Sequence, residues 1–275
     1  MKKTTQRAIV TTVGLLLLLS ILSAITACSS SQDNIINTSN SSKTENSAGN
    51  TSNSNGEIRD FTLSASTPSK LIVNNDVGSV DVQSANNSNN VHVKVTKSQG
   101  NPSDIQTNYS QSGNTVTITI KRINTNSIAK ADADITLPSK ADLQLQNGTG
   151  DIKVRGIEGQ MLLTNGTGSI HATQVKLTSN AQLQTGTGNV NFSGSIGSGN
   201  YQFQSSTGNV DVSLPSTASF RVNATTNVGN ISSDFTSVQV QQNMVGASAS
   251  GSIGNAPSAM ITLTTATGSI DLKRD

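Results

Sequence analysis

The sequence contains little cysteine, charge or aromatic character, and each shortage excludes a class of protein. The 275 residues include one cysteine, Cys28, so a disulfide within the chain is impossible. Charged residues make up only 12% of the chain, and tryptophan is missing, which leaves few rings for stacking on sugars. The net charge of +2 depends on three basic residues among the first seven; without residues 1–27 the chain carries −1. This balance argues against nucleic acid as a partner.

Residues 1–27 have the pattern of a lipoprotein signal peptide. A basic start is followed by an apolar run from Ala8 to Ala27, and then by Cys28. The stretch Ile25-Thr26-Ala27-Cys28 resembles the lipobox of bacterial lipoproteins. The resemblance implies cleavage before Cys28, acylation of Cys28 with fatty acids such as palmitate, and anchoring in the cell membrane or outer membrane, outside the cytoplasm. An ordinary signal peptide or a retained membrane anchor is the alternative.

Residues 28–56 read as a tether between the lipidated cysteine and the folded domain. Serine, asparagine and threonine dominate this stretch, and Ile35 and Ile36 are its only large apolar residues. Such a segment cannot bury enough apolar surface to offset the entropy of ordering it, so we predict that it is disordered. A flexible chain of this length spans about 30 Å on average.

From residue 57 onward the pattern changes to the period of two that is typical of β-strands. Residues 91–95 and 115–120 alternate cleanly between apolar and polar, and no helix-period segment of useful length follows. The sequence therefore predicts an all-β domain over 57–275. Within it, residues 84–142 are expected to form irregular coils or hairpins, and residues 143–275 to form regular repeats.

One short pattern recurs seven times, each time around a glycine. Positions −7, −5 and +2 from that glycine are apolar in all seven copies. The glycines are Gly78, Gly150, Gly168, Gly188, Gly208, Gly229 and Gly268. Successive spacings from Gly150 to Gly229 are 18, 20, 20 and 21 residues, a period of the kind found in repeat proteins. The last interval of 39 residues indicates two periods with one degenerate copy, which includes residues 246–251.

Each repeat is expected to form two short strands joined at the glycine, which would adopt a positive φ. One such unit cannot bury its apolar face alone, whereas stacked units align their columns into a continuous core. We therefore predict a β-solenoid similar to a parallel β-helix, in which the polar residues around the glycine form ladders. An antiparallel meander is the alternative, but it gives no reason for identical residue types in one frame.

The lipobox, the polar tether and the repeated Thr-Gly turns resemble the adhesin-like β-strand-repeat family of bacterial envelope proteins. The resemblance covers residues 57–275, including the closing stretch from Met260 to Ile270. It implies surface exposure and a role in adhesion or envelope stress. It supplies no catalytic residues.

Titratable side chains are too sparse to indicate catalysis or metal binding. From Leu143 on there are six acidic residues, and in the repeat frame they are not expected to fall on adjacent coils of one column. Paired carboxylates of a polysaccharide-active enzyme are therefore not expected. The two histidines, His92 and His171, occupy outward strand positions far apart in the sequence. We predict no metal site, no cofactor and no enzyme activity.

Paired glutamines on the outward side of the first strand of three repeats form a candidate contact face. They are Gln144, Gln146, Gln182, Gln184, Gln202 and Gln204. Their function would be to contact a glycan or an envelope protein; alternatively, they form a soluble outer face with amide ladders. The sequence thus predicts a non-enzymatic, surface-anchored lipoprotein for adhesion, binding or scaffolding. An accessory role in envelope-stress sensing and a polysaccharide-active enzyme are the alternatives.

Overall fold

The computed structural model describes residues 58–64, 69–85 and 90–275. The predicted signal peptide, Cys28 and the tether lie outside the described residues. Within the described ranges, no helix is long and apolar enough to cross a membrane. The strands form two sheets of eleven strands each, which we call sheet A and sheet B.

Sheet A contains, in spatial order, β1 (Ile58–Ser64), β4 (Asn90–Ser98), β7 (Lys130–Pro138), β3 (Val80–Ala85), β9 (Ile152–Arg155), β12 (Ile170–Leu177), β14 (Val190–Ile196), β16 (Val210–Leu214), β22 (Ile270–Arg274) and β18 (Ile231–Ser233), with β10 (Glu158–Gly159) beside β12. Sheet B contains β19 (Val238–Gln242), β20 (Ala247–Ile253), β17 (Phe220–Val228), β21 (Ala259–Thr267), β15 (Gly199–Thr207), β13 (Ala181–Thr187), β11 (Met161–Thr167), β8 (Ala141–Thr149), β2 (Ser69–Val77), β6 (Thr115–Arg122) and β5 (Ile105–Ser112). A 3₁₀ turn, η1 (Pro102–Asp104), precedes β5.

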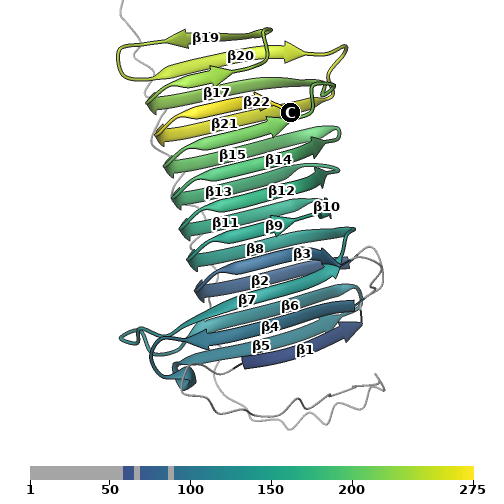
Figure 1. The fold of residues 1–275 in the computed structure, drawn as a ribbon, viewed down its shortest axis with the longest axis vertical. Coiled ribbons are helices and arrows are strands. Elements are labelled where there is room, and N and C mark those ends of the chain that lie inside the picture. The colour runs from purple at the N-terminus through teal and green to yellow at the C-terminus, as the bar shows by residue number, and fades with distance from the viewer. Residues whose placement is uncertain (1–57, 65–68, 86–89) are drawn as a thin grey trace, which may run out of the picture. The chain divides into compact units, whose positions relative to one another are not determined.

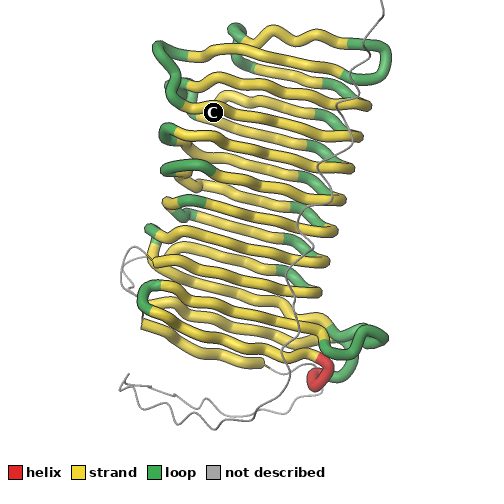
Figure 2. Tube along the Cα trace, turned by 180° about the vertical axis from the view of Figure 1, so that it is seen from behind, coloured by secondary structure: helices red, strands yellow, loops and turns green. Residues whose placement is uncertain are grey.

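Each repeat forms one coil, with a strand in sheet B, a corner at the glycine and a strand in sheet A. Neighbouring coils pair in parallel and in register, so Leu163 lies beside Leu183 and Ile170 beside Val190. Figure 1 shows the arrows of β8, β11, β13 and β15 pointing one way while those of β12 and β14 in sheet A return, and Figure 2 shows the same stack from behind. The predicted β-solenoid is confirmed, and the antiparallel meander is wrong for these repeats.

The three predicted apolar columns form the core between the two sheets. The residues at −7, −5 and +2 are buried in all seven coils. Alternation puts every second side chain of a strand on one face, so each strand contributes two or more side chains to this core. In the middle of the stack, the Phe192 and Phe203 rings pack with centroids 5.0 Å apart.

The coils do not stack in the order of the chain. The first coil, β2–β3, lies between β8–β9 and β6–β7. The last coil, β21–β22, lies between β15–β16 and β17–β18. In Figure 1 the yellow strands β21 and β22 therefore lie within the green part of the stack. The first and last repeats are interior coils. Beyond the first repeat lie β4 to β7 and the preceding strand β1, and beyond the last repeat lie β17 to β20.

Antiparallel strands lie at both ends of the described stack. At one end β5 pairs antiparallel with β6, and β4 pairs antiparallel with both β7 and β1. At the other end β20 pairs antiparallel with β17, and β19 with β20. The expectation of a degenerate coil at residues 246–251 is wrong, because this stretch belongs to β20 and runs against its neighbour. Its small residues Ala247 and Ala249 are buried, and β20 pairs with β17 at this end of sheet B.

Candidate functional site

The Thr-Gly corner is a structural device. All seven frame glycines have φ between 123° and 146°, as predicted, a range that L side chains rarely adopt. A Cβ atom on Gly188 would also lie 2.2 Å from the carbonyl oxygen of Gly168 on the neighbouring coil. The frame glycine therefore recurs because of its positive φ and the close approach of stacked backbones.

A column of buried polar residues at position −3 holds adjacent corners together. It consists of Asn75, Asn147, Asn165, Thr185, Ser205, Thr265 and Thr226, in stacking order. Thr185 Oγ1 donates to the carbonyl of Gly168 at 2.7 Å, and Thr226 Oγ1 donates to that of Gly268 at 2.8 Å. The sequence analysis missed this column, although all seven copies carry a small hydrogen-bonding residue there.

A second ladder follows the glycine, as the sequence predicted. In four coils the side-chain oxygen of the residue at +1 accepts from the backbone amide of the equivalent residue one coil on; these residues are Asp151, Ser169, Asn189 and Asn209. Asn189 Oδ1 accepts from Asn209 N at 2.9 Å, and Asn209 Oδ1 accepts from Ser269 N at 2.9 Å. These side chains satisfy backbone donors at the corner and are therefore occupied by the fold.

The three asparagines of the −3 column differ from its hydroxyl members. Their Nδ2 atoms donate to corner carbonyls, as Asn165 Nδ2 does to Gly150 O at 2.9 Å. The Oδ1 atoms of Asn75, Asn147 and Asn165 are buried without a hydrogen-bond partner. A buried acceptor without a donor costs free energy, so this end of the column is less well satisfied than the end with threonine and serine.

The central part of the outward side of sheet B carries no charged side chain on any of the eleven strands, whereas Lys70, Asp142 and Arg221 lie outward near its margin. Strand pairing aligns its central outward side chains in two rows. The first row contains Ser110, Thr117, Ile72, Gln144, Leu162, Gln182, Gln202, Thr262, Asn223, Ser250 and Gln239. The second contains Asn108, Thr119, Asn74, Gln146, Thr164, Gln184, Gln204, Thr264, Thr225, Ser248 and Gln241. We call these two rows the uncharged face.

All six predicted glutamines lie on this face, but they do not form one continuous block. The pairs on β13 and β15 are direct neighbours, whereas Leu162 and Thr164 on β11 separate them from the pair on β8. Gln182 Nε2 donates to Gln184 Oε1 at 2.9 Å, and Gln202 Nε2 donates to Gln204 Oε1 at 3.3 Å. These bonds hold the amides along the strand and fix their direction.

The outward side of sheet A has the opposite composition. Its corresponding row contains Lys94, Asp134, Asp81, Lys153, His171, Asn191, Asp211, Asp271 and Ser232. Lys273 Nζ lies 3.5 Å from Asp211 Oδ1 on the adjacent strand. Charged residues of both signs therefore gather on sheet A, although the two sheets share one core.

Asp211 and Asp271 are neighbours on sheet A, which contradicts the expectation that no two acidic residues share a column on adjacent coils. They meet because β22 lies beside β16 and not after β18. Burial raises the pKa of Asp211, and the Asp271 carboxyl adds to this effect against the attraction of Lys273. Ser232 Oγ donates to Asp271 Oδ1.

The two histidines are far apart, as the sequence indicated. His92 is exposed on β4, and His171 on β12 shares a 3.1 Å hydrogen bond with the Asn191 amide. Among the residues that the structure describes, no three histidine, cysteine, aspartate or glutamate side chains gather in a way that could hold a metal ion.

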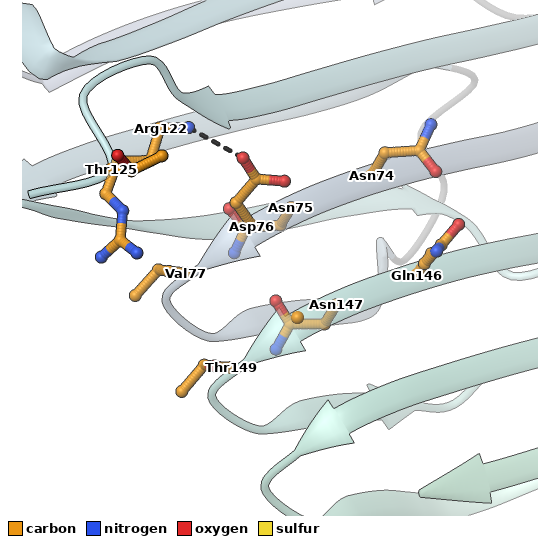
Figure 3. A pocket seen from close by; sticks show the side chains of 10 residues that line it. Asn74, Asn75, Asp76, Val77, Arg122, Thr125, Gln146, Asn147 and Thr149 are labelled. Atoms are coloured by element: carbon orange, nitrogen blue, oxygen red, sulfur yellow. Dashed lines mark hydrogen bonds between the residues drawn. The ribbon is translucent and has the colours of Figure 1, made fainter. Parts of the chain in front are cut away.

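A pocket adjoins the uncharged face where β2, β8 and the segment after β6 meet (Figure 3). Asn74 and Gln146 of the face contribute to its lining, together with Asp76, Arg122 and Thr125. The backbone amide of Arg122 donates to Asp76 Oδ2 at 3.0 Å, which joins the two coils. The pocket thus places one carboxylate and one guanidinium beside the uncharged rows.

The parallel coils, corner ladders and antiparallel ends define the protein as a capped β-solenoid. The chain belongs to the Toastrack DUF4097 family, whose sequence profile matches residues 31–273. No curated protein matches the chain.

Solved structures of low sequence identity are similar to it. A candidate cell adhesion protein from Clostridium sporogenes is 14% identical, with a TM-score of 0.46, and the match covers 80% of this chain and 100% of that one. A candidate adhesin from Bacteroides fragilis is 12% identical, with a TM-score of 0.32 and coverage of 78% and 97%. A candidate lipid-binding protein from Parabacteroides distasonis is 12% identical, with a TM-score of 0.26 and coverage of 80% and 97%.

Proposed function

We propose that this protein is a lipid-anchored, non-enzymatic binding protein of the bacterial envelope that acts in adhesion or scaffolding. The observation that carries the proposal is the uncharged face, which extends without interruption across eleven strands of sheet B. Its side chains protrude from a backbone that is fixed by strand pairing, so a ligand would meet an ordered surface and little entropy would be lost on binding.

The division of charge between the sheets supports this role. Solubility requires charged surface, and sheet A supplies it with residues such as Lys153 and Asp81. The uncharged face is thereby left free for contact with a partner. Many equivalent weak contacts along one face add up through avidity, which suits attachment better than turnover.

Anchoring is the second part of the proposal, and it is supported by the sequence around Cys28. Acyl chains on Cys28 would hold the protein in the membrane, since each buried methylene contributes about 0.8 kcal/mol. The polar stretch 28–56 would then act as the tether between the membrane and the solenoid. The protein would function outside the cytoplasm, on the cell membrane or the outer membrane.

The contact face is tested with the intact protein on its own cells. Gln204→Glu places one negative charge in the middle of the uncharged face, and Ser213→Glu places the same charge on the outward side of sheet A as the matched control. We expect Gln204→Glu to reduce attachment of cells or of envelope fragments about tenfold, and Ser213→Glu to leave it unchanged. Equal attachment by both variants and the parent protein would refute the contact face.

The anchor is tested by Cys28→Ala, followed by cell fractionation and labelling with a fatty-acid probe. The variant should lose the label, and it should be released or remain uncleaved. A variant that stays membrane-bound and is cut at the usual place would refute lipidation of Cys28.

The alternative function is that of a polysaccharide-active enzyme. One observation favours it: the Asp211 and Asp271 carboxyls are neighbours on adjacent strands. Incubation of the intact protein with envelope and matrix glycans, followed by analysis of reducing ends, separates the two. Turnover that is lost in Asp211→Asn would replace our proposal, whereas binding without turnover agrees with it.

A further inference from the structure

We infer that the ligand of the uncharged face is a neutral, linear polysaccharide that lies along the stack of coils. This inference rests on the proposed binding function and specifies the chemistry and the direction of the ligand. It draws on three properties of the face: its charge, its polarity and its repeat.

The charge of the face excludes polyelectrolytes as its ligand. Neither row contains an aspartate, glutamate, lysine, arginine or histidine. A polyanion is bound through lysine and arginine with release of counterions, and a polycation needs carboxylates in the same way. The electrostatic partner of an uncharged surface is an uncharged ligand.

The polarity of the face excludes apolar ligands and disfavours a protein. Ile72 and Leu162 are the apolar members of the two rows, and Leu162 is 39% exposed. Protein interfaces depend on aromatic and arginine anchors in a desolvated centre, and neither row has such an anchor. Glutamine, asparagine, threonine and serine side chains both donate and accept hydrogen bonds, which matches the hydroxyl groups of a sugar.

The repeat of the face favours a polymer over a single small molecule. Equivalent outward positions recur on every strand, about 4.8 Å apart, so the eleven strands span about 48 Å. A linear polymer along this direction would meet the same pair of positions at each step. The bonds from Gln182 to Gln184 and from Gln202 to Gln204 run within a strand and orient these amides before a ligand arrives.

The first test uses the intact lipoprotein in detergent, with soluble linear β-glucans as the neutral probe and alginate as the polyanionic one. We expect the neutral glucans to bind and alginate not to bind. Neutral binding should change less than twofold between about 0.05 M and 0.5 M salt, because no charges are paired. Gln204→Glu should weaken it about tenfold, and Ser213→Glu should not.

The second test addresses the direction of the ligand with glucan oligomers of increasing length. Affinity should increase over roughly ten sugar units, because each added unit reaches another coil. Asn223→Asp, near one end of the face, should weaken binding of long oligomers only. The central change Gln204→Glu should weaken binding of both long and short oligomers. The thermal midpoints of the variants confirm that each one is folded.

Several outcomes would overturn the inference. Preferential or salt-sensitive binding of alginate would contradict a neutral ligand, and affinity that levels off at two or three sugars would contradict the axial direction. A chain that is dimeric in solution and becomes monomeric in Gln204→Glu would identify the face as a contact between two copies. If Gln204→Glu abolishes cell attachment but no neutral glycan binds the parent protein, the proposed function stands and this inference is wrong.

Discussion

Sheet A and sheet B are built from the same repeats, yet their outward sides differ in charge. Each coil contributes one strand to each sheet, and the same apolar columns fill the space between the sheets. Outward on sheet A lie charged residues such as Lys153 and Asp211, whereas the two central rows of sheet B contain none. The fold therefore constrains the inward positions on both sheets and leaves the outward composition free to differ.

The largest effect should come from breaking the core that both faces share. Phe203→Ala removes the ring that packs on Phe192 and leaves a cavity between the sheets. We expect a loss of about 3–5 kcal/mol in the free energy of unfolding, measured by chemical denaturation. Gln204→Ala, the next residue on the same strand but on the outward side, should cost less than about 0.5 kcal/mol. Similar losses for the two variants would show that inward and outward positions are not distinct.

The next effect concerns the corner where the two sheets meet. Gly188→Ala forces a side chain onto a residue with φ of 136° and places Cβ 2.2 Å from the Gly168 carbonyl oxygen. We expect a loss of at least about 2 kcal/mol from backbone strain and the clash together. Gly113 is a matched control, since its φ is 55° and nothing lies within 4 Å of an added Cβ. Gly113→Ala should cost only about 1 kcal/mol, and an equal loss at both sites would contradict the close approach of coils.

A smaller effect, a gain in stability, is expected in the buried polar column at position −3. Asn165→Thr replaces a side chain whose Oδ1 is buried without a partner by the residue found at the equivalent position 185. The new hydroxyl should donate to the Gly150 carbonyl as Thr185 does to Gly168, and stability should increase by about 1 kcal/mol. The reverse change, Thr185→Asn, should lower the thermal midpoint. A higher thermal midpoint for Thr185→Asn would show that a buried asparagine oxygen without a partner does not destabilise the column.

The smallest effect concerns charge on sheet A. Burial and Asp271 raise the pKa of Asp211 in the folded protein, so the folded state binds this proton more tightly than the unfolded state. The ionised Asp211 carboxyl therefore lowers the free energy of unfolding. This loss is absent at pH below the ordinary carboxyl pKa of 3.8, and it develops as pH rises through the raised pKa. Asp211→Asn should stabilise the protein by about 0.5 kcal/mol at neutral pH, since it removes like charges on adjacent strands.

The gain from Asp211→Asn should disappear in acid, and denaturation curves across this range measure it. The same change at Asp151 should alter stability little, because an asparagine oxygen can still accept from the Ser169 amide, as Asn189 and Asn209 do at equivalent positions. A gain in Asp211→Asn that persists below pH 3.8 would show that repulsion from Asp271 is not its cause.

Periodicity predicted the local structure well, because burial and backbone geometry impose it within each repeat. The alternation around Leu183 and Val190 placed both residues in the core, and the positive φ of Gly188 followed from its place at the corner. The −3 column could have been found from the same frame, since threonine at 185 and serine at 205 are small and polar as the asparagines are. The uncharged face was predicted only in part, because β5, β6, β19 and β20 do not carry the glycine frame.

The sequence by itself determined the unit: two strands, a glycine corner and the columns that each unit buries. Tertiary structure alone decided which units are neighbours. A coil with apolar residues at −7, −5 and +2 fits against any other such coil, and the backbone bonds between them do not depend on sequence. Long-range packing therefore placed β21–β22 beside β15–β16, where Thr265 reaches the Gly208 carbonyl at 2.8 Å. The Asp211–Asp271 pair and the full length of the uncharged face follow from that choice of neighbours.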